Sequence, residues 1–146
     1  MICESTSLSK YINKSSNIFF VFGPEIVLKN NSVDLINSFL KEKSFNEKKI
    51  ITESDYSKIE STILENASGS LFGSKIIIEI NHLKGKIPKE IVNIFEMQDI
   101  KKFNDIAIII KSSIEKINKN TKWVKLLDSL GSVSYTHLTL PTKNEV

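Results

Sequence analysis

Three short, almost uninterrupted apolar runs constrain the fold of this chain more than any other feature. They read IFFVF at 18–22, KIIIEI at 75–80 and DIAIIIK at 105–111. Runs of this length have the size of a β-strand, and a strand without a polar residue at every second position is typical of a sheet that is buried on both faces. We therefore predict a parallel sheet with helices on either side.

Helical patterns alternate with these runs, and a fourth strand is predicted at 49–53. We expect helices to begin at Pro24, at Ser54 or Asp55, and at Pro88. A last helix has Trp123, Leu126, Leu127 and Leu130 at helical spacing, and Gly131 should end it. Because strands and helices alternate, the chain should make right-handed crossovers. The prediction is a three-layer α/β domain with a parallel sheet of at least four strands.

The size of the chain suits one domain. With 146 residues, of which 40% are hydrophobic, it is long enough to bury a core of its own. We divide it into an N-terminal extension at 1–17, with a short helix around Leu8, Tyr11 and Ile12, and a domain at 18–131. No apolar run reaches the length of a signal-peptide core or a membrane span, so we expect a cytoplasmic protein without a membrane partner.

The net charge of +3 comes entirely from lysine, since all twenty basic residues are Lys and none is Arg. Isoleucine and asparagine are also abundant, a pattern that AT-rich codons produce. Recognition of phosphates and bases relies on the arginine fork, so we interpret the lysines as a solvated face and keep a nucleic-acid binder as an alternative. The clearest lysine clusters are at 84, 86 and 89 and at 116, 119, 122 and 125.

The last segment differs in composition from the rest of the chain. From Val133 to Thr142 it contains no lysine, isoleucine or asparagine, and VSYTHLTLPT resembles the translation of a sequencing adapter. We interpret 132–146 as adapter read-through that carries no function, and the chain as a truncated gene fragment.

The stretch SGSLFGSK at 68–75 approaches a phosphate-binding loop without matching one. In the pattern G-x-x-x-x-G-K-[ST] counted from Gly69, the second glycine falls one residue early, and the stretch leads into a strand instead of following one. The loop after the first strand is Gly23-Pro24-Glu25, where proline removes an N–H group and Glu25 adds negative charge. We therefore expect no nucleotide cofactor at either place.

No arrangement of residues in the sequence indicates catalysis or a metal. A single cysteine, Cys3, and two distant histidines cannot build a disulfide or a metal cluster, and we expect no catalytic residue. We interpret His82 as a surface loop residue and Trp123 as part of the core. Glu79 is either an outward strand residue, which we prefer, or a buried acid with a partner.

The order of the segments resembles a known family. FFVFGPEIVL, SGSLFGSKIIIEI and IAIIIKSSIEKINKNTKWVKLLDSLG, in this order and spacing, resemble the N-terminal domain of the delta subunit of bacterial DNA polymerase III, the clamp-loader subunit that opens the sliding clamp. The resemblance covers residues 18–131. It implies a RecA-like, P-loop-NTPase-like (AAA+-related) domain without a functional P-loop or a catalytic site of its own, within a DNA-directed DNA polymerase (nucleotidyltransferase) holoenzyme.

The resemblance also implies a binding site. In this family a Leu-Phe pair at the end of a helix enters an apolar pocket of the clamp, the beta subunit. The pair maps onto Leu71 and Phe72, flanked by Ser70 and Gly73. Members of the family often have a glutamine ahead of the pair, and here Ala67 occupies about that position. Other loader subunits would bind through C-terminal domains that this sequence lacks, and DNA would be contacted indirectly or weakly.

Two alternatives remain open besides the nucleic-acid binder. Leu71 and Phe72 could be ordinary core residues, since most aliphatic-aromatic pairs are buried. The chain could instead be a degenerate P-loop NTPase or an ATP-dependent ATPase subunit of a clamp loader.

Overall fold

A computed structural model of the chain describes residues 2–4, 17–67, 75–97, 105–114, 117 and 120–135. The elements are β1 (Ile2–Glu4), β2 (Ile18–Phe22), α2 (Ile26–Glu42), β3 (Phe45–Ile51), the 3-10 helix η2 (Glu53–Lys58), α3 (Ile59–Ala67), β4 (Lys75–His82), α4 (Lys89–Glu96), β5 (Ile106–Ser112), α5 (Lys122–Leu130) and β6 (Ser132–Tyr135).

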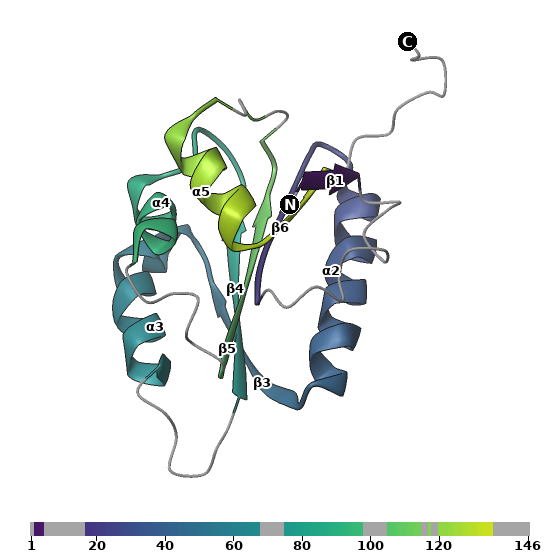
Figure 1. Cartoon of the computed structure of the whole chain (residues 1–146), viewed down its shortest axis with the longest axis vertical. Coiled ribbons are helices and arrows are strands. Elements are labelled where there is room, and N and C mark those ends of the chain that lie inside the picture. Colours follow the sequence, from purple (N-terminus) through teal and green to yellow (C-terminus); the bar gives the residue numbers. More distant parts are fainter. Residues whose placement is uncertain are drawn as a thin grey trace.

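The strands form one sheet in the order β1-β6-β2-β5-β4-β3, and every neighbouring pair is parallel. Helix α2 covers one face, and α3, α4 and α5 cover the other (Figure 1). The predicted three-layer α/β architecture is therefore confirmed. The sheet has two more strands than the minimum of four, because β1 and β6 extend it beyond β2.

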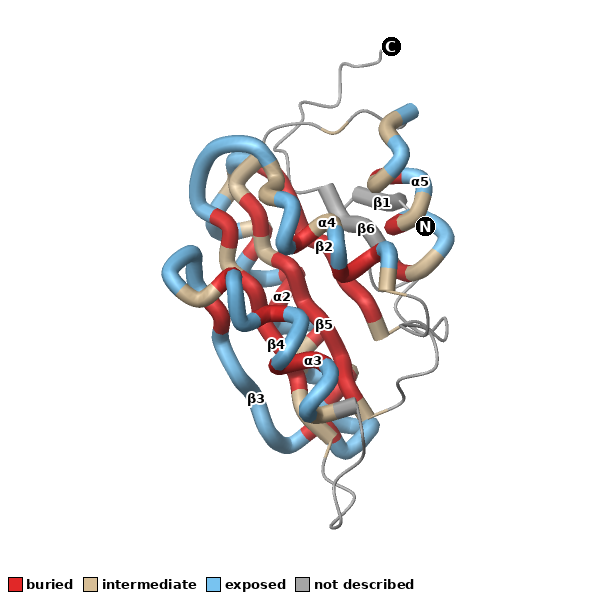
Figure 2. Tube along the Cα trace, turned by 90° about the vertical axis from the view of Figure 1, so that its left-hand side faces the viewer, coloured by how far each residue is buried: buried red, intermediate tan, exposed pale blue. Residues whose placement is uncertain are grey.

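Alternate residues of the central strands supply two separate cores. On β2, Phe19 and Val21 pack toward α2, whereas Phe20 and Phe22 pack toward the three helices on the opposite face. The same division runs through β4 and β5, which are buried along most of their length (Figure 2). Burial on both faces explains why these strands lack polar alternation.

The edge strand β3 differs from the prediction in length and in burial. It begins at Phe45 instead of residue 49, and its side chains are buried at Phe45 and Ile51 but exposed from 46 to 50. Charged side chains on an edge strand oppose unwanted strand pairing, which explains the polar sequence NEKK between its two ends.

The helices agree with the prediction apart from their ends. Helix α4 follows Pro88, and α5 ends at Gly131, as expected. The segment that was predicted to begin at Ser54 or Asp55 starts with η2 and continues as α3. Leu64, on α3, is an exposed leucine.

Trp123 is a core residue, as predicted. It is partly buried, its ring stacks on Phe95 with the ring centroids 6.2 Å apart, and it contacts Phe20 at a centroid distance of 5.8 Å. Such aromatic contacts add to the free energy gained by burial. They attach α5 both to α4 and to the sheet.

The two ends of the described chain meet in the sheet. Residues 132–135, the start of the segment that we interpret as adapter read-through, form β6 between β1 and β2. Strand pairing uses the main chain, which nearly every sequence can supply. The interpretation of this segment stays a prediction about the gene. The short helix that we expect near residues 8–12 lies outside the described residues.

Candidate functional site

The four residues of the predicted binding site, Ser70, Leu71, Phe72 and Gly73, lie outside the described residues. Their surroundings are described on both sides: α3 ends at Ala67, and β4 begins at Lys75. The segment therefore follows a helix and joins it to the amino end of a strand. Lys75 is at the amino end of β4, at the edge of the sheet opposite to the carboxyl ends of the strands (Figure 1).

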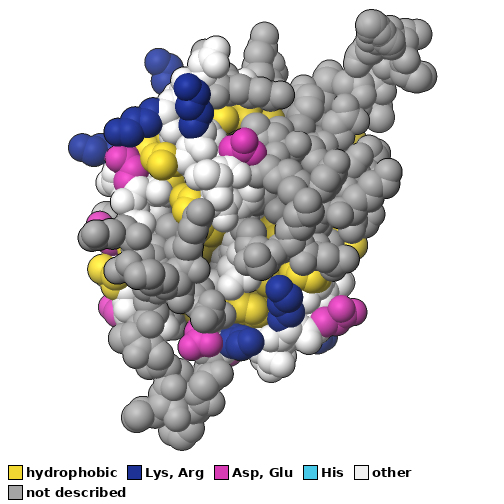
Figure 3. Space-filling view, in the orientation of Figure 1, with side chains coloured by type: hydrophobic (Ala, Val, Ile, Leu, Met, Phe, Trp, Pro, Cys, Tyr) yellow, Lys and Arg dark blue, Asp and Glu magenta, His cyan; other side chains and the backbone are white. Residues whose placement is uncertain are grey.

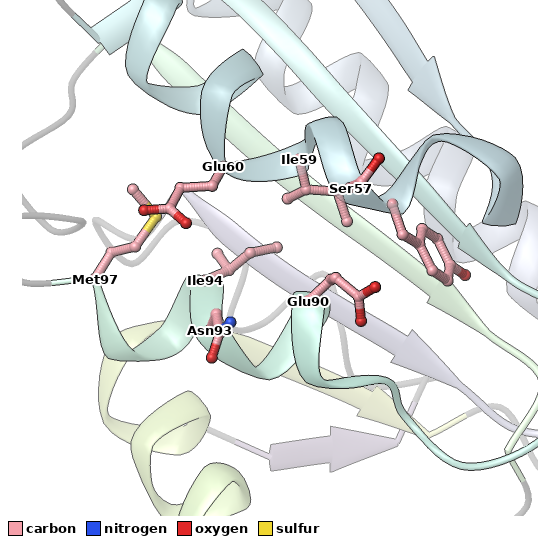
Figure 4. A pocket seen from close by; sticks show the side chains of 8 residues that line it. Ser57, Ile59, Glu60, Glu90, Asn93, Ile94 and Met97 are labelled. Carbon is pink, nitrogen blue, oxygen red and sulfur yellow. The ribbon is translucent and has the colours of Figure 1, made fainter.

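A small cleft separates η2 and α3 from α4. Ser57, Ile59 and Glu60 line one side of it, and Glu90, Asn93, Ile94 and Met97 line the other (Figure 4). Its volume of about 70 Å³ is well below that of typical small-molecule sites, so we assign no ligand to it.

Tyr56 also lines this cleft and connects η2 to the sheet. Its hydroxyl donates a hydrogen bond of 2.6 Å to the carbonyl oxygen of Asn81. Burial, and after it the negative charges of Glu53 and Glu90, raise the pKa of Tyr56 to about 12.

The carboxyl edge of the sheet contains the position at which open α/β sheets usually bind ligands. Strands β2 and β5 are neighbours, and the helices that follow them, α2 and α5, lie on opposite faces of the sheet. Where the helices after two neighbouring strands lie on opposite faces, a crevice is left beyond the carboxyl ends of the strands. The loop at this crevice is Gly23-Pro24-Glu25, and the exposed Ile26 begins α2. The Gly-Lys-[Ser/Thr] sequence of a phosphate-binding loop is not present here, because the lysine of this turn, Lys29, follows Leu28 and precedes Asn30.

A buried lysine reaches across this crevice. The Nζ atom of Lys29, on α2, donates to the carbonyl oxygen of Ser112 at 3.2 Å and to Oγ of Ser113 at 2.9 Å. The side chain is only 3% exposed. Burial, and to a smaller extent the positive charge of Lys111, lower the pKa of Lys29.

His82 is buried, so its interpretation as a surface loop residue was wrong. It is the last residue of β4 and is 2% exposed. Its Nε2 lies 3.1 Å from the carbonyl oxygen of Lys86, to which it must donate, and its Nδ1 lies 2.8 Å from Oγ of Ser112. In the neutral ring, Nδ1 then accepts the hydroxyl proton of Ser112. The strand IIIEINH continues two residues further than predicted, which carries His82 into the sheet.

Glu79 is also buried, so our preference for an outward strand residue was wrong and the alternative holds. It is 7% exposed and pairs with Lys48 on β3, with 2.8 Å between Oε1 and Nζ. Because β4 is an inner strand, both of its faces are covered, and a carboxylate on it requires a partner.

A cavity of about 430 Å³ opens at the carboxyl edge. Its residues come from the start of α2, from η2 and from the ends of β4 and β5. They include Ile26, Lys29, Thr52, Glu53, Ser54, Asn81, His82, Leu83, Lys111 and Ser113.

Sequence reasoning missed this cavity, although the sequence contains a signal for it. Polar residues stand at the ends of two buried strands, Asn81-His82 at the end of β4 and Ser112-Ser113 at the end of β5. The carboxyl ends of parallel strands meet at one edge of the sheet, which brings such residues together.

The lysines that the structure describes among the predicted clusters, at 84, 86, 89, 122 and 125, are exposed. Lysine side chains gather at the upper left of the molecule, near α4 and α5 (Figure 3). They protrude into solvent, in agreement with a solvated face.

Two further searches cover the described part of the chain. No helix in it is long and apolar enough to cross a membrane. Within the same residues, no three side chains of His, Cys, Asp or Glu lie together as a metal site would require.

The sheet and its helices define a parallel α/β domain with a RecA-like fold, which solved structures share. The Bacillus subtilis DNA clamp loader delta protein (YqeN) superposes with a TM-score of 0.61 over 90% of this chain, at 15% sequence identity. This chain covers 42% of that protein, so it spans less than half of its length. The similarity establishes a clamp-loader-like fold.

Two other solved structures share the fold. Caenorhabditis elegans PCH-2 matches 90% of this chain with a TM-score of 0.51 and 12% identity, and the match covers 38% of PCH-2. Rif2, solved in complex with the C-terminal domain of Rap1, matches 95% of this chain with a TM-score of 0.50 and 16% identity, over 53% of its own length. No protein-family model and no curated protein sequence matches the chain.

Proposed function

We propose that this chain is the N-terminal domain of a clamp-loader delta subunit, which binds the sliding clamp and helps to open it during DNA replication. The observation that carries the proposal is the clamp-loader-like fold over 90% of the chain. The order of the sequence segments supports it, because they resemble the delta family independently of the superposition.

The clamp contact is assigned to Leu71 and Phe72, with Ser70 and Gly73 beside them. The segment directly follows α3, in agreement with a pair presented at the end of a helix. Burying a leucine and a phenylalanine in a partner contributes about 1.5–3 kcal/mol each before the costs of association. The neighbours of the pair in the sequence, Ser70 and Gly73, are small residues.

In this proposal the domain has no catalytic activity of its own. It acts as a subunit of the DNA polymerase III holoenzyme and joins the other loader subunits through further domains. The first turn of α2, with Pro24 before it and the exposed Ile26 in it, supports a role without nucleotide. Measurable ATP binding by this domain would instead favour a clamp-loader ATPase or a related NTPase.

The test is capture of the cognate beta clamp by the immobilised 146-residue chain. The double variant Leu71→Ala with Phe72→Ala should lose most of the captured clamp. Leu64→Ala is the matched control, because Leu64 is an exposed leucine on α3 outside the segment. Equal capture by the double variant and the parent would rule out Leu71 and Phe72 as the contact.

A further inference from the structure

The cavity at the carboxyl edge has the properties of a binding site that the clamp contact does not use. Its volume of about 430 Å³ falls within the range of small-molecule sites, and it lies at the position where open α/β sheets bind ligands. The predicted clamp contact belongs to a different part of the chain, between the end of α3 at Ala67 and the start of β4 at Lys75.

The cavity has apolar walls. Ile26 at the start of α2 and Leu83 after β4 both line it, and their side chains are 65% and 70% exposed. These exposures are high for large aliphatic residues on either side of one hollow. An apolar ligand would remove both side chains from water.

A cation without an acidic partner lies in the same cavity. Lys29 and its hydrogen-bond partner Ser113 both line it, and the Nζ atom of Lys29 bonds to two uncharged oxygen atoms. Among the described residues, no carboxylate lies within ion-pair distance of Lys29. An ammonium group has three donors, so one of its N–H groups remains for a ligand.

We propose that this cavity binds a monocarboxylate attached to an apolar body, with the ammonium of Lys29 as the counter-ion and with Ile26 and Leu83 as the apolar walls. A buried cation is stabilised when an anion is placed beside it. Burial lowers the pKa of Lys29, in agreement with a charge that has no counter-ion in the free protein.

The chemistry of the cavity favours a carboxylate over a phosphate. Pro24 provides no N–H group at the start of α2, and the nearby Lys111 donates to Oδ1 of Asn30 at 2.5 Å. Glu53 also lines the cavity and would repel a dianion more strongly than a monoanion. One available ammonium group suits one negative charge.

The test is ligand-observed NMR with the 146-residue chain and sodium octanoate below its micellar concentration. Octanol has the same alkyl chain without the charge, and octyl phosphate has a second negative charge. We expect saturable binding of octanoate that is tighter than that of both controls. Two outcomes would count against the proposal: no binding of octanoate, or tighter binding of octyl phosphate than of octanoate. Either outcome overturns it if the carboxylate peptide described next also fails to bind.

The carboxylate could arrive on a free small molecule or on a polypeptide, and a second arm distinguishes these sources. Acetyl-Glu-Leu-amide is compared with acetyl-Gln-Leu-amide, which lacks the charge. Binding that depends on Lys29 in either arm supports the proposal. Binding in neither arm overturns it.

The decisive variants separate charge from fold. Lys29→Met should weaken the binding of the carboxylate ligand about tenfold, the value of one charged hydrogen bond. Leu83→Glu places a fixed carboxylate at the rim and should also weaken binding, and because Leu83 is exposed this variant keeps its fold. Leu64→Glu, an exposed position on α3, is the matched control. Unchanged binding in Leu83→Glu would contradict the proposed site even if Lys29→Met fails to fold.

This inference is independent of the proposed clamp contact. The double variant Leu71→Ala with Phe72→Ala should bind octanoate like the parent chain. Failure of one proposal therefore leaves the other intact.

Discussion

The Nζ atom of Lys29 lies 3.2 Å from the carbonyl oxygen of Ser112, so that helix α2 is bonded to the end of β5 across the crevice at the carboxyl edge. The hydroxyl group of the same Ser112 lies 2.8 Å from Nδ1 of His82, at the end of β4. One serine thus connects a helix and two strands through buried polar groups. Buried networks of this kind are stabilising only while their members are paired.

The charge of Lys29 should make the stability of the protein depend on pH. Because the folded pKa lies below the ordinary value of 10.5, the unfolded state binds more protons between these two values. We measure the free energy of unfolding of the parent and of Lys29→Met in urea at each pH. The value for the parent minus the value for the variant should therefore increase as the pH approaches 10.5. Lys122→Met, which removes an exposed lysine, is the control for the loss of one positive charge.

Tyr56 should contribute the opposite dependence at higher pH. Below pH 10, Tyr56→Phe should cost about 1 kcal/mol, because it removes the hydrogen bond to Asn81. The folded pKa of about 12 lies above the ordinary value of 10, so the unfolded state loses its proton first. The advantage of the parent over Tyr56→Phe should then shrink from pH 10 to 12. A constant difference over this range would contradict the raised pKa.

The ion pair between Lys48 and Glu79 should respond asymmetrically to substitution. Lys48→Met leaves a buried carboxylate without its partner and should cost about 1–3 kcal/mol. Glu79→Met should cost less, because the remaining lysine side chain is 36% exposed and can reach water. Chemical denaturation of both variants measures the free energy of unfolding. A larger decrease in Glu79→Met than in Lys48→Met would contradict the prediction that the buried carboxylate depends more on its partner than the lysine does.

Gly131 should not tolerate a side chain. A Cβ atom at this position would overlap the carbonyl group of Ile18, and backbone at both places leaves little freedom to move. We expect Gly131→Ala to lower the free energy of unfolding by about 1–3 kcal/mol, as other overpacking substitutions do.

Gly85→Ala is the comparison for this substitution. Gly85 has open space around it, but its φ of +83° is left-handed, so alanine there should cost about 1–2 kcal/mol through backbone strain alone. Gly131→Ala should therefore unfold at the lower urea concentration. A neutral effect would show that the contact between Gly131 and Ile18 is looser than described.

Local patterns in the sequence predicted the layers of this fold. The runs at 18–22, 75–80 and 105–111 form inner strands because consecutive apolar residues can be buried only where both faces of a sheet are covered. Helix α5 followed from the period of its apolar residues, and its end followed from the glycine at 131. Strand β1 was not predicted, because three residues are too few to show a period.

The predicted clamp-binding residues depend on a family resemblance and on the order of segments, and they remain a prediction. The carboxyl-edge cavity could not be predicted with its chemistry. The sequence places Lys29 and Ser112 far apart, and neither residue type indicates burial.

The sequence by itself therefore determined the alternation of strands and helices, because each element follows from residues that are close along the chain. Only the tertiary structure decided which polar side chains are buried and what they contact. Lys29, Glu79 and His82 each depend on a partner or on cover from another element. The free energy of a buried polar group is set by those distant neighbours and not by its own residue type.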